Sequence, residues 1–142
     1  MISLCLPATL DSLDELGKYV VAATSEAGLE TKPAYGLRLA VDEIATNIIT
    51  HGYEEAGRSG NVTVSGELTD ASLTIVLEDS GVPFDPLSRK LPDADELNLP
   101  LEERNIGGLG IFLVLNGVDK FSYEFCDGKN RNIFVMNRPG RG

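Results

Sequence analysis

Two stretches in the N-terminal third repeat apolar residues every three or four positions, which predicts two amphipathic helices. The first spans about 11–27, with Asp11 as its cap and Gly28 just beyond its end. The second begins at Thr31 and runs to about His51. Both helices carry an apolar stripe along one side only, so each is expected to pack against a second layer.

The other regular segments alternate apolar and polar residues one by one, which predicts half-buried strands. They are a short strand at 2–7, a hairpin of 61–68 and 72–79 and a final hairpin of 119–126 and 132–137. A further short helix is predicted at 111–118, before the final hairpin. This order predicts an α+β fold, a two-layer sandwich in which a mixed, mostly antiparallel sheet carries its helices on one face. A length of 142 residues fits a single domain, residues 1–142.

Charge narrows the classes of ligand. The formal net charge is −10, from 22 Asp and Glu against 12 Lys and Arg. Such a chain repels a phosphate backbone, so no nucleic-acid partner is expected. A phosphate-bearing small ligand would need a metal ion and local backbone donors to offset this field. A basic protein partner would instead be attracted.

The cellular compartment is predicted from the lack of a membrane-spanning segment and of a signal peptide in the sequence. No apolar run approaches the roughly 18–20 residues that span a bilayer, and the first residues do not form a signal peptide. Cys5 and Cys126 have no metal-ligand spacing around them, so they are expected to be reduced, packed thiols. We therefore expect a cytoplasmic protein with no membrane partner.

The second predicted helix carries a carboxylate and an amide one turn apart. Glu43 and Asn47 have i,i+4 spacing and border the apolar stripe of this helix. They would point into a groove at the edge of the core. The alternative is an ordinary solvated flank of an amphipathic helix.

A second candidate segment follows the strand at 72–79. Asp79 ends this strand and Gly81 comes two residues later, a pattern that ordinary turns also show. In a binding site, the carboxylate could accept a hydrogen bond from an exocyclic amine. Gly81, which has no side chain, would let a flat ring lie against the backbone.

A third segment closes a long irregular stretch, residues 80–106, of the kind that is often functional in small domains. Gly107, Gly108, Leu109 and Gly110 open the helix predicted at 111–118, so their free N–H groups could hold phosphate oxygens. The spacing is that of neither a Rossmann fingerprint nor a Walker A loop. A hinge is the alternative interpretation.

The three segments together resemble a known family. E-x-x-x-N on a helix, D-x-G after a strand and a glycine-rich turn into a helix occur in this order in the GHKL ATPases, which include gyrase, heat-shock chaperones and sensor histidine kinases. The chain looks most like the anti-sigma-factor serine/threonine kinases. The matching text is DEIATN at 42–47, HGY at 51–53, VPFDP at 82–86 and LEERNIGGLGI at 101–111. The resemblance implies the Bergerat, or GHKL, ATPase fold.

The resemblance also assigns roles to residues, with ATP and Mg²⁺ as cofactors. It implies that Asn47 binds Mg²⁺, that Asp79 accepts from the adenine amino group and that Gly81 lies beneath the ring. It implies that Glu43 is the catalytic base. The residues that would wrap the phosphates are Gly107, Gly108, Leu109 and Gly110. Arg104 either contacts a phosphate or pairs with a neighbouring glutamate on the surface.

By this resemblance the protein is a kinase that phosphorylates an anti-anti-sigma (STAS-type) antagonist and sequesters a sigma factor or analogous regulator. An alternative is an ATP-binding partner-switching module without significant kinase turnover. The catalytic half of a histidine kinase is a third class, disfavoured because no phospho-acceptor histidine lies on a preceding helical hairpin. Relatives often form dimers, so a homodimer stays open.

Overall fold

Five strands form one sheet in the order β1-β2-β3-β5-β4. They are β1 (Leu4–Pro7), β2 (Asn61–Leu68), β3 (Ser72–Asp79), β4 (Lys120–Cys126) and β5 (Lys129–Asn137). The computed structural model describes residues 1–88 and 114–139, and every strand pair within these ranges is antiparallel. This agrees with the mostly antiparallel sheet predicted from the alternating segments.

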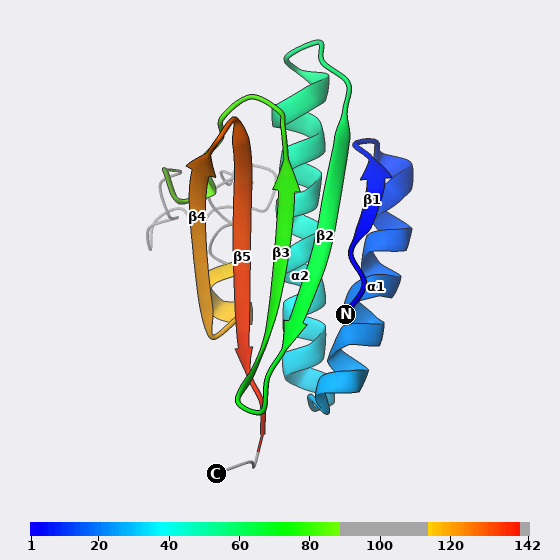
Figure 1. Cartoon of the computed structure of the whole chain (residues 1–142), viewed down its shortest axis with the longest axis vertical. Helices are drawn as coiled ribbons and strands as arrows, with labels where there is room; N and C mark the ends of the chain where they lie inside the picture. The colour runs from blue at the N-terminus through cyan, green and yellow to red at the C-terminus, as the bar shows by residue number, and fades with distance from the viewer. Residues whose placement is uncertain (89–113, 140–142) are drawn as a thin grey trace, which may run out of the picture.

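Two long helices, α1 (Leu13–Ala27) and α2 (Thr31–Asn47), lie side by side on one face of this sheet (Figure 1). Their apolar stripes and the inward side chains of the strands form one core. Its fully buried members include Leu16, Val20, Leu37, Ile44, Val62, Val64, Leu73, Ile75, Leu77 and Phe134. The predicted α+β two-layer sandwich is confirmed.

The start of α1 differs from the prediction, whereas its end does not. A 3₁₀ turn, Leu10–Ser12, precedes the helix, and Asp11 lies inside this turn instead of capping the helix. No side-chain cap closes the N-terminus of α1. Gly28 has a φ of 72° at the C-terminus, the left-handed conformation that glycine adopts without strain.

The second helix runs further than its sequence pattern predicts. We expected it to end at about His51, but a π-helical turn, Ile48–Glu54, continues it through Gly52. Glycine weakens a helix only by about 1 kcal/mol, so tertiary contacts can override it. Tyr53, just beyond Gly52, is 2% exposed and therefore held by such contacts.

The two cysteines correct another expectation. Cys5 on β1 and Cys126 on β4 are both free, as predicted, but both are exposed instead of packed. They lie on the two strands at the edges of the sheet, where fewer neighbours cover a side chain. A thiol at either position can therefore react with reagents in solution.

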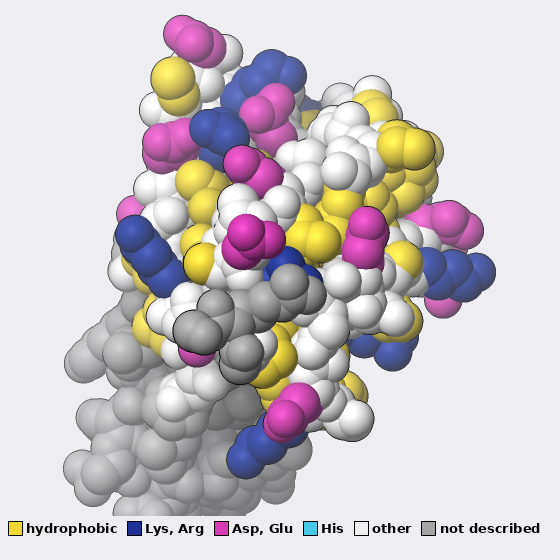
Figure 2. All heavy atoms as spheres, turned by 60° about the horizontal axis from the view of Figure 1, so that its bottom comes forward, with side chains coloured by type: hydrophobic (Ala, Val, Ile, Leu, Met, Phe, Trp, Pro, Cys, Tyr) yellow, Lys and Arg dark blue, Asp and Glu magenta, His cyan; other side chains and the backbone are white. Residues whose placement is uncertain are grey.

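The surface that comes forward in Figure 2 belongs to the lower end of Figure 1, where α2 begins. Acidic, basic and hydrophobic side chains are interspersed over this face (Figure 2). The excess of acidic residues is therefore not gathered into one patch there. Within the described ranges, no helix is long and apolar enough to cross a bilayer.

Candidate functional site

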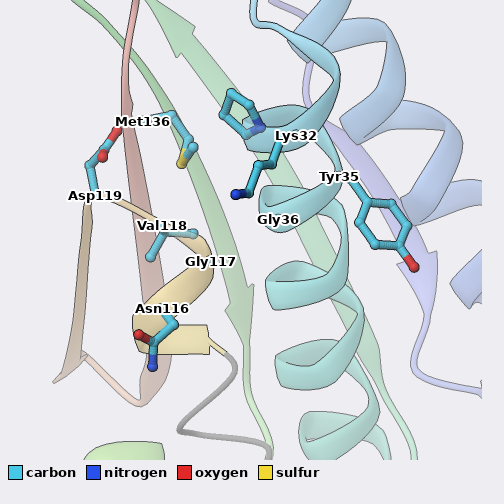
Figure 3. A pocket seen from close by; sticks show the side chains of 9 residues that line it. Lys32, Tyr35, Gly36, Asn116, Gly117, Val118, Asp119 and Met136 are labelled. Carbon is cyan, nitrogen blue, oxygen red and sulfur yellow. The ribbon is translucent and has the colours of Figure 1, made fainter.

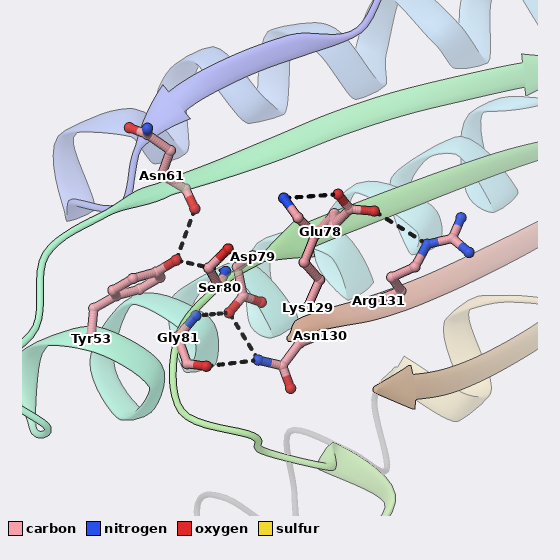
Figure 4. A network of polar contacts seen from close by, with 9 residues as sticks. All are labelled: Tyr53, Asn61, Glu78, Asp79, Ser80, Gly81, Lys129, Asn130 and Arg131. Atoms are coloured by element: carbon pink, nitrogen blue, oxygen red, sulfur yellow. Dashed lines mark hydrogen bonds and ion pairs between the residues drawn. The ribbon is translucent and has the colours of Figure 1, made fainter. Parts of the chain in front are cut away.

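The candidate site lies at the opposite end of the sheet, where α2, β3 and β5 come together. In the sheet register Asp79, the last residue of β3, pairs with Asn130 near the start of β5. The π-helical turn that extends α2 reaches the chain just after β3. Residues far apart in the sequence therefore meet around the Asp79 carboxylate (Figure 4).

Asp79 is buried, with only 3% of its surface exposed, and its two carboxylate oxygens differ. Oδ1 accepts hydrogen bonds from the backbone N–H of Gly81, at 2.9 Å, and from Nδ2 of Asn130, at 3.1 Å. Oδ2 is buried and has no hydrogen-bond partner within the described part of the chain. Burial raises the pKa of Asp79, and the two hydrogen bonds oppose this rise. The site thus presents one unused, buried acceptor.

Gly81 is required by close backbone contact. A Cβ atom at this position would lie 2.7 Å from the carbonyl oxygen of Gly52 and 3.1 Å from Oδ1 of Asp79. The next residue, Val82, donates its N–H to the same Gly52 oxygen at 3.1 Å. The end of α2 and the segment after β3 are therefore locked together by their backbones.

Two side chains of the π-helical turn strengthen this connection. The His51 ring stacks on Phe84, with centroids 5.2 Å apart and an interplanar angle of 21°. The Tyr53 hydroxyl donates to the carbonyl of Asn61 at 3.0 Å and accepts from the N–H of Ser80 at 2.9 Å. Since π-helical turns are frequent at functional sites, this irregularity marks the same region as the unpaired carboxylate oxygen.

Asn130 is a residue that sequence reasoning missed. It is 2% exposed, and its Nδ2 donates to Oδ1 of Asp79 and to the carbonyls of Gly81 and Val82, at 3.1, 3.3 and 3.2 Å. A signal was present in the sequence, since Asn130 and Asn132 occupy alternate positions of a strand whose alternate residues are apolar further on. Two amides on the buried face of a strand need a polar partner or a ligand.

The two candidates on α2 sit one turn before this region. Glu43 is half-buried, and Asn47 is buried at 8% exposure. The Nδ2 atom of Asn47 has no hydrogen-bond partner among the described residues, so this N–H donor is available to an acceptor atom of a ligand. The π-helical turn joins Asn47 directly to the Gly52–Gly81 contact.

The remaining predicted site residues fall outside the described ranges. They are Arg104, Gly107, Gly108, Leu109 and Gly110. The structure therefore brings together the adenine-side candidates and the end of α2, and the phosphate-side candidates stay a prediction. In the described ranges, no three His, Cys, Asp or Glu side chains are grouped so that they could hold a metal ion.

Two pockets of similar size lie at opposite ends of the molecule. One, of about 410 Å³, opens between the first turn of α2 and residues 116–119, and it contains none of the predicted site residues (Figure 3). The other, of about 460 Å³, is lined by Asp79, Tyr53 and Ser80 together with charged side chains such as Arg58 and Lys129. Only the second pocket adjoins the candidate site.

A comparison of the sequence with models of known protein families identifies the family of this chain. Residues 6–137 match the model of the histidine kinase-like ATPase domain. The chain belongs to this family. A curated relative, the serine-protein kinase RsbW of Bacillus cereus, is 29% identical over 129 residues, which cover 89% of this chain and 79% of the relative. The family assignment agrees with the resemblance seen in the three sequence segments.

Two solved structures share the fold of this family member at low sequence identity. The RsbU and RsbW domains of Rv1364c from Mycobacterium tuberculosis match with a TM-score of 0.64 and 16% identity, over 99% of this chain and 34% of that one. The chain thus spans about a third of that protein. The SiaB-SiaC complex of Pseudomonas aeruginosa matches with a TM-score of 0.63 and 13% identity, over 96% of this chain and 89% of that one.

Proposed function

We propose that this chain is an ATP-dependent serine/threonine protein kinase of the anti-sigma-factor type. It phosphorylates a STAS-type anti-anti-sigma antagonist and sequesters a sigma factor or an analogous regulator. The observation that carries the proposal is the buried Asp79 carboxylate, whose Oδ2 lacks a partner while its Oδ1 is doubly hydrogen-bonded. A buried acceptor without a donor is costly unless a ligand supplies one.

Adenine carries a donor that suits this acceptor. Its exocyclic amino group is a donor that the unpaired Oδ2 of Asp79 can accept. Gly81, which carries no side chain, is proposed to lie beneath the flat ring. The triphosphate then extends toward the glycine-rich turn, where Gly107, Gly108, Leu109, Gly110 and Arg104 are proposed to bind it.

Asn47 is proposed to hold Mg²⁺. One amide oxygen, phosphate oxygens and water suit an ion that keeps much of its hydration, so the absence of a carboxylate cluster in the described ranges does not count against it. When bound, Mg²⁺ neutralises phosphate charge. Glu43 lies one turn before Asn47 and is proposed to take the proton of the incoming serine or threonine hydroxyl.

The relatives guide the choice of partner. The curated relative is named as a serine-protein kinase, and one structural neighbour was solved as a complex of two proteins. A chain of net charge −10 would be steered toward a basic partner surface. A homodimer, a single domain over residues 1–142 and a cytoplasmic location belong to this proposal as predictions.

Calorimetry with ATP and Mg²⁺, followed by an assay of phosphate transfer to a STAS-type protein, tests the proposal. Asp79→Asn should weaken ATP binding at least tenfold, because the new amide turns a donor toward the adenine amine. The matched control is Asp70→Asn, the same change at an exposed hairpin turn. Wild-type protein that does not bind ATP would refute the proposal.

The same experiment separates the alternative function. If the wild type binds ATP but produces no ADP with or without the antagonist, the chain is a partner-switching module without kinase turnover. In that case, the nucleotide must still change the affinity for a partner, since a ligand that binds both states equally shifts nothing.

A further inference from the structure

Asn130 is held from both sides. Its Nδ2 faces Asp79, whereas its Oδ1 accepts from the N–H of Phe84, at 3.2 Å, and from the hydroxyl of Tyr123 on β4. A backbone N–H can only donate, so the oxygen of the carboxamide must face Phe84. The Tyr123 hydroxyl adds a second donor on the same side. The amide is therefore fixed in one of its two flip states.

This orientation determines which atom of Asp79 is left for a ligand. With Nδ2 of Asn130 and the N–H of Gly81 both donating to Oδ1, only Oδ2 remains as an acceptor. A flipped carboxamide would place oxygen against oxygen, which would remove a donor and repel the carboxylate. A hydrogen-bonded chain thus runs from β4 through β5 to the end of β3.

We infer that Tyr123 and Asn130 are positioning residues for base selection. They hold Asp79 with one free acceptor, so that the site selects a purine with an amino group at carbon 6 over one with hydrogen or a carbonyl oxygen there. The inference rests on the proposed function and extends it to two residues that do not touch the base. It makes base selection depend on the edge strand β4.

The test compares dissociation constants for ATP and for purine riboside triphosphate, which differs only by lacking the 6-amino group. Wild-type protein should prefer ATP by about tenfold or more, as expected for a hydrogen bond to a charged acceptor. In Asn130→Ala the ratio of the dissociation constant for the analogue to that for ATP should be close to one. Tyr123→Phe should lower the ratio only in part, by about threefold, because Phe84 still holds the amide oxygen. Affinity for the analogue should change little in either variant.

Asn137→Ala is the control. Asn137 is an asparagine of the same strand, but it is exposed and pairs with Ser72 at the opposite end of β5 from Asp79. The ratio of the two dissociation constants in this variant should equal that of the wild type. If Asn130→Ala fails to fold, as judged by circular dichroism, Tyr123→Phe, which keeps the ring, decides the matter.

The outcomes are distinguishable. If both variants weaken ATP and the analogue equally, so that the ratio is unchanged, the two residues only support the fold and the inference is wrong. Wild-type protein that binds both nucleotides with equal affinity also overturns it, but leaves ATP binding intact. Wild-type protein that binds neither nucleotide overturns the proposed function itself.

Discussion

Gly52 and Gly81 are in backbone contact, so closely that a Cβ atom on Gly81 would lie 2.7 Å from the Gly52 carbonyl oxygen. One residue belongs to the π-helical end of α2 and the other follows β3. The contact therefore links Asn47, the proposed metal ligand, to Asp79, the proposed adenine acceptor, through a single helical turn. A nucleotide that spans both residues would meet a preformed distance between them.

The two glycines in this contact should differ in how well they tolerate a side chain. We expect Gly81→Ala to lower the free energy of unfolding by about 1–3 kcal/mol and to weaken ATP binding, because the opposing atom is backbone and cannot rotate away. Gly52→Ala is the control, since its Cβ would meet nothing closer than 3.9 Å. Urea unfolding of both variants provides the comparison. Equal stability of the two would contradict the packing seen here.

The Asp79 carboxyl should make the stability of the nucleotide-free protein and the affinity for ATP depend on pH in opposite directions. Because its pKa is raised in the folded state, its contribution to stability is complete below the unfolded pKa and is lost as pH rises through the folded pKa. Without ATP, Asp79→Asn should therefore be more stable than wild type at neutral pH, with the difference shrinking in acid.

ATP binding needs the ionised carboxylate, so the affinity of the wild type should fall as pH drops through the folded pKa of Asp79. Asp79→Asn should bind weakly throughout. Melting curves of both proteins between about pH 4 and 8, with and without ATP, give both quantities. An ATP affinity that does not change over this range would argue against Asp79 as the acceptor.

Glu43→Gln should separate binding from chemistry. The amide keeps the shape of the side chain, so ATP should still bind, while phosphate transfer should slow by about 10²–10⁴-fold, as when a general base is lost. Single-turnover kinetics and calorimetry measure the two effects. Transfer at the wild-type rate would leave Glu43 with an orienting role only.

Tyr53 should contribute to stability through its hydroxyl. Tyr53→Phe leaves the Ser80 N–H and the Asn61 carbonyl without a partner, which should cost about 1–3 kcal/mol. Tyr35→Phe is the control, because that ring is 59% exposed. Thermal unfolding of both variants checks the difference. A Tyr53→Phe protein as stable as Tyr35→Phe would mean that water replaces the hydroxyl.

Local patterns were enough to predict α1 and α2 apart from the start of the first and the end of the second, the strands of both hairpins and the two-layer fold. Such patterns depend on neighbours within one turn of helix or two residues of strand, which the sequence lists directly. The same holds for Asp79 and Gly81, whose D-x-G spacing marks a strand end. The family could also be inferred, since its segments are short and keep their order.

Only the tertiary structure decided which residues surround Asp79. Its partner Asn130 is 51 residues away and reaches it because β5, not β4, pairs with β3. The continuation of α2 through Gly52 likewise depends on contacts with residues after β3, and these outweigh the local preference of glycine to end a helix. Strand order and close backbone contact are set by how the whole chain packs, and no local pattern encodes them.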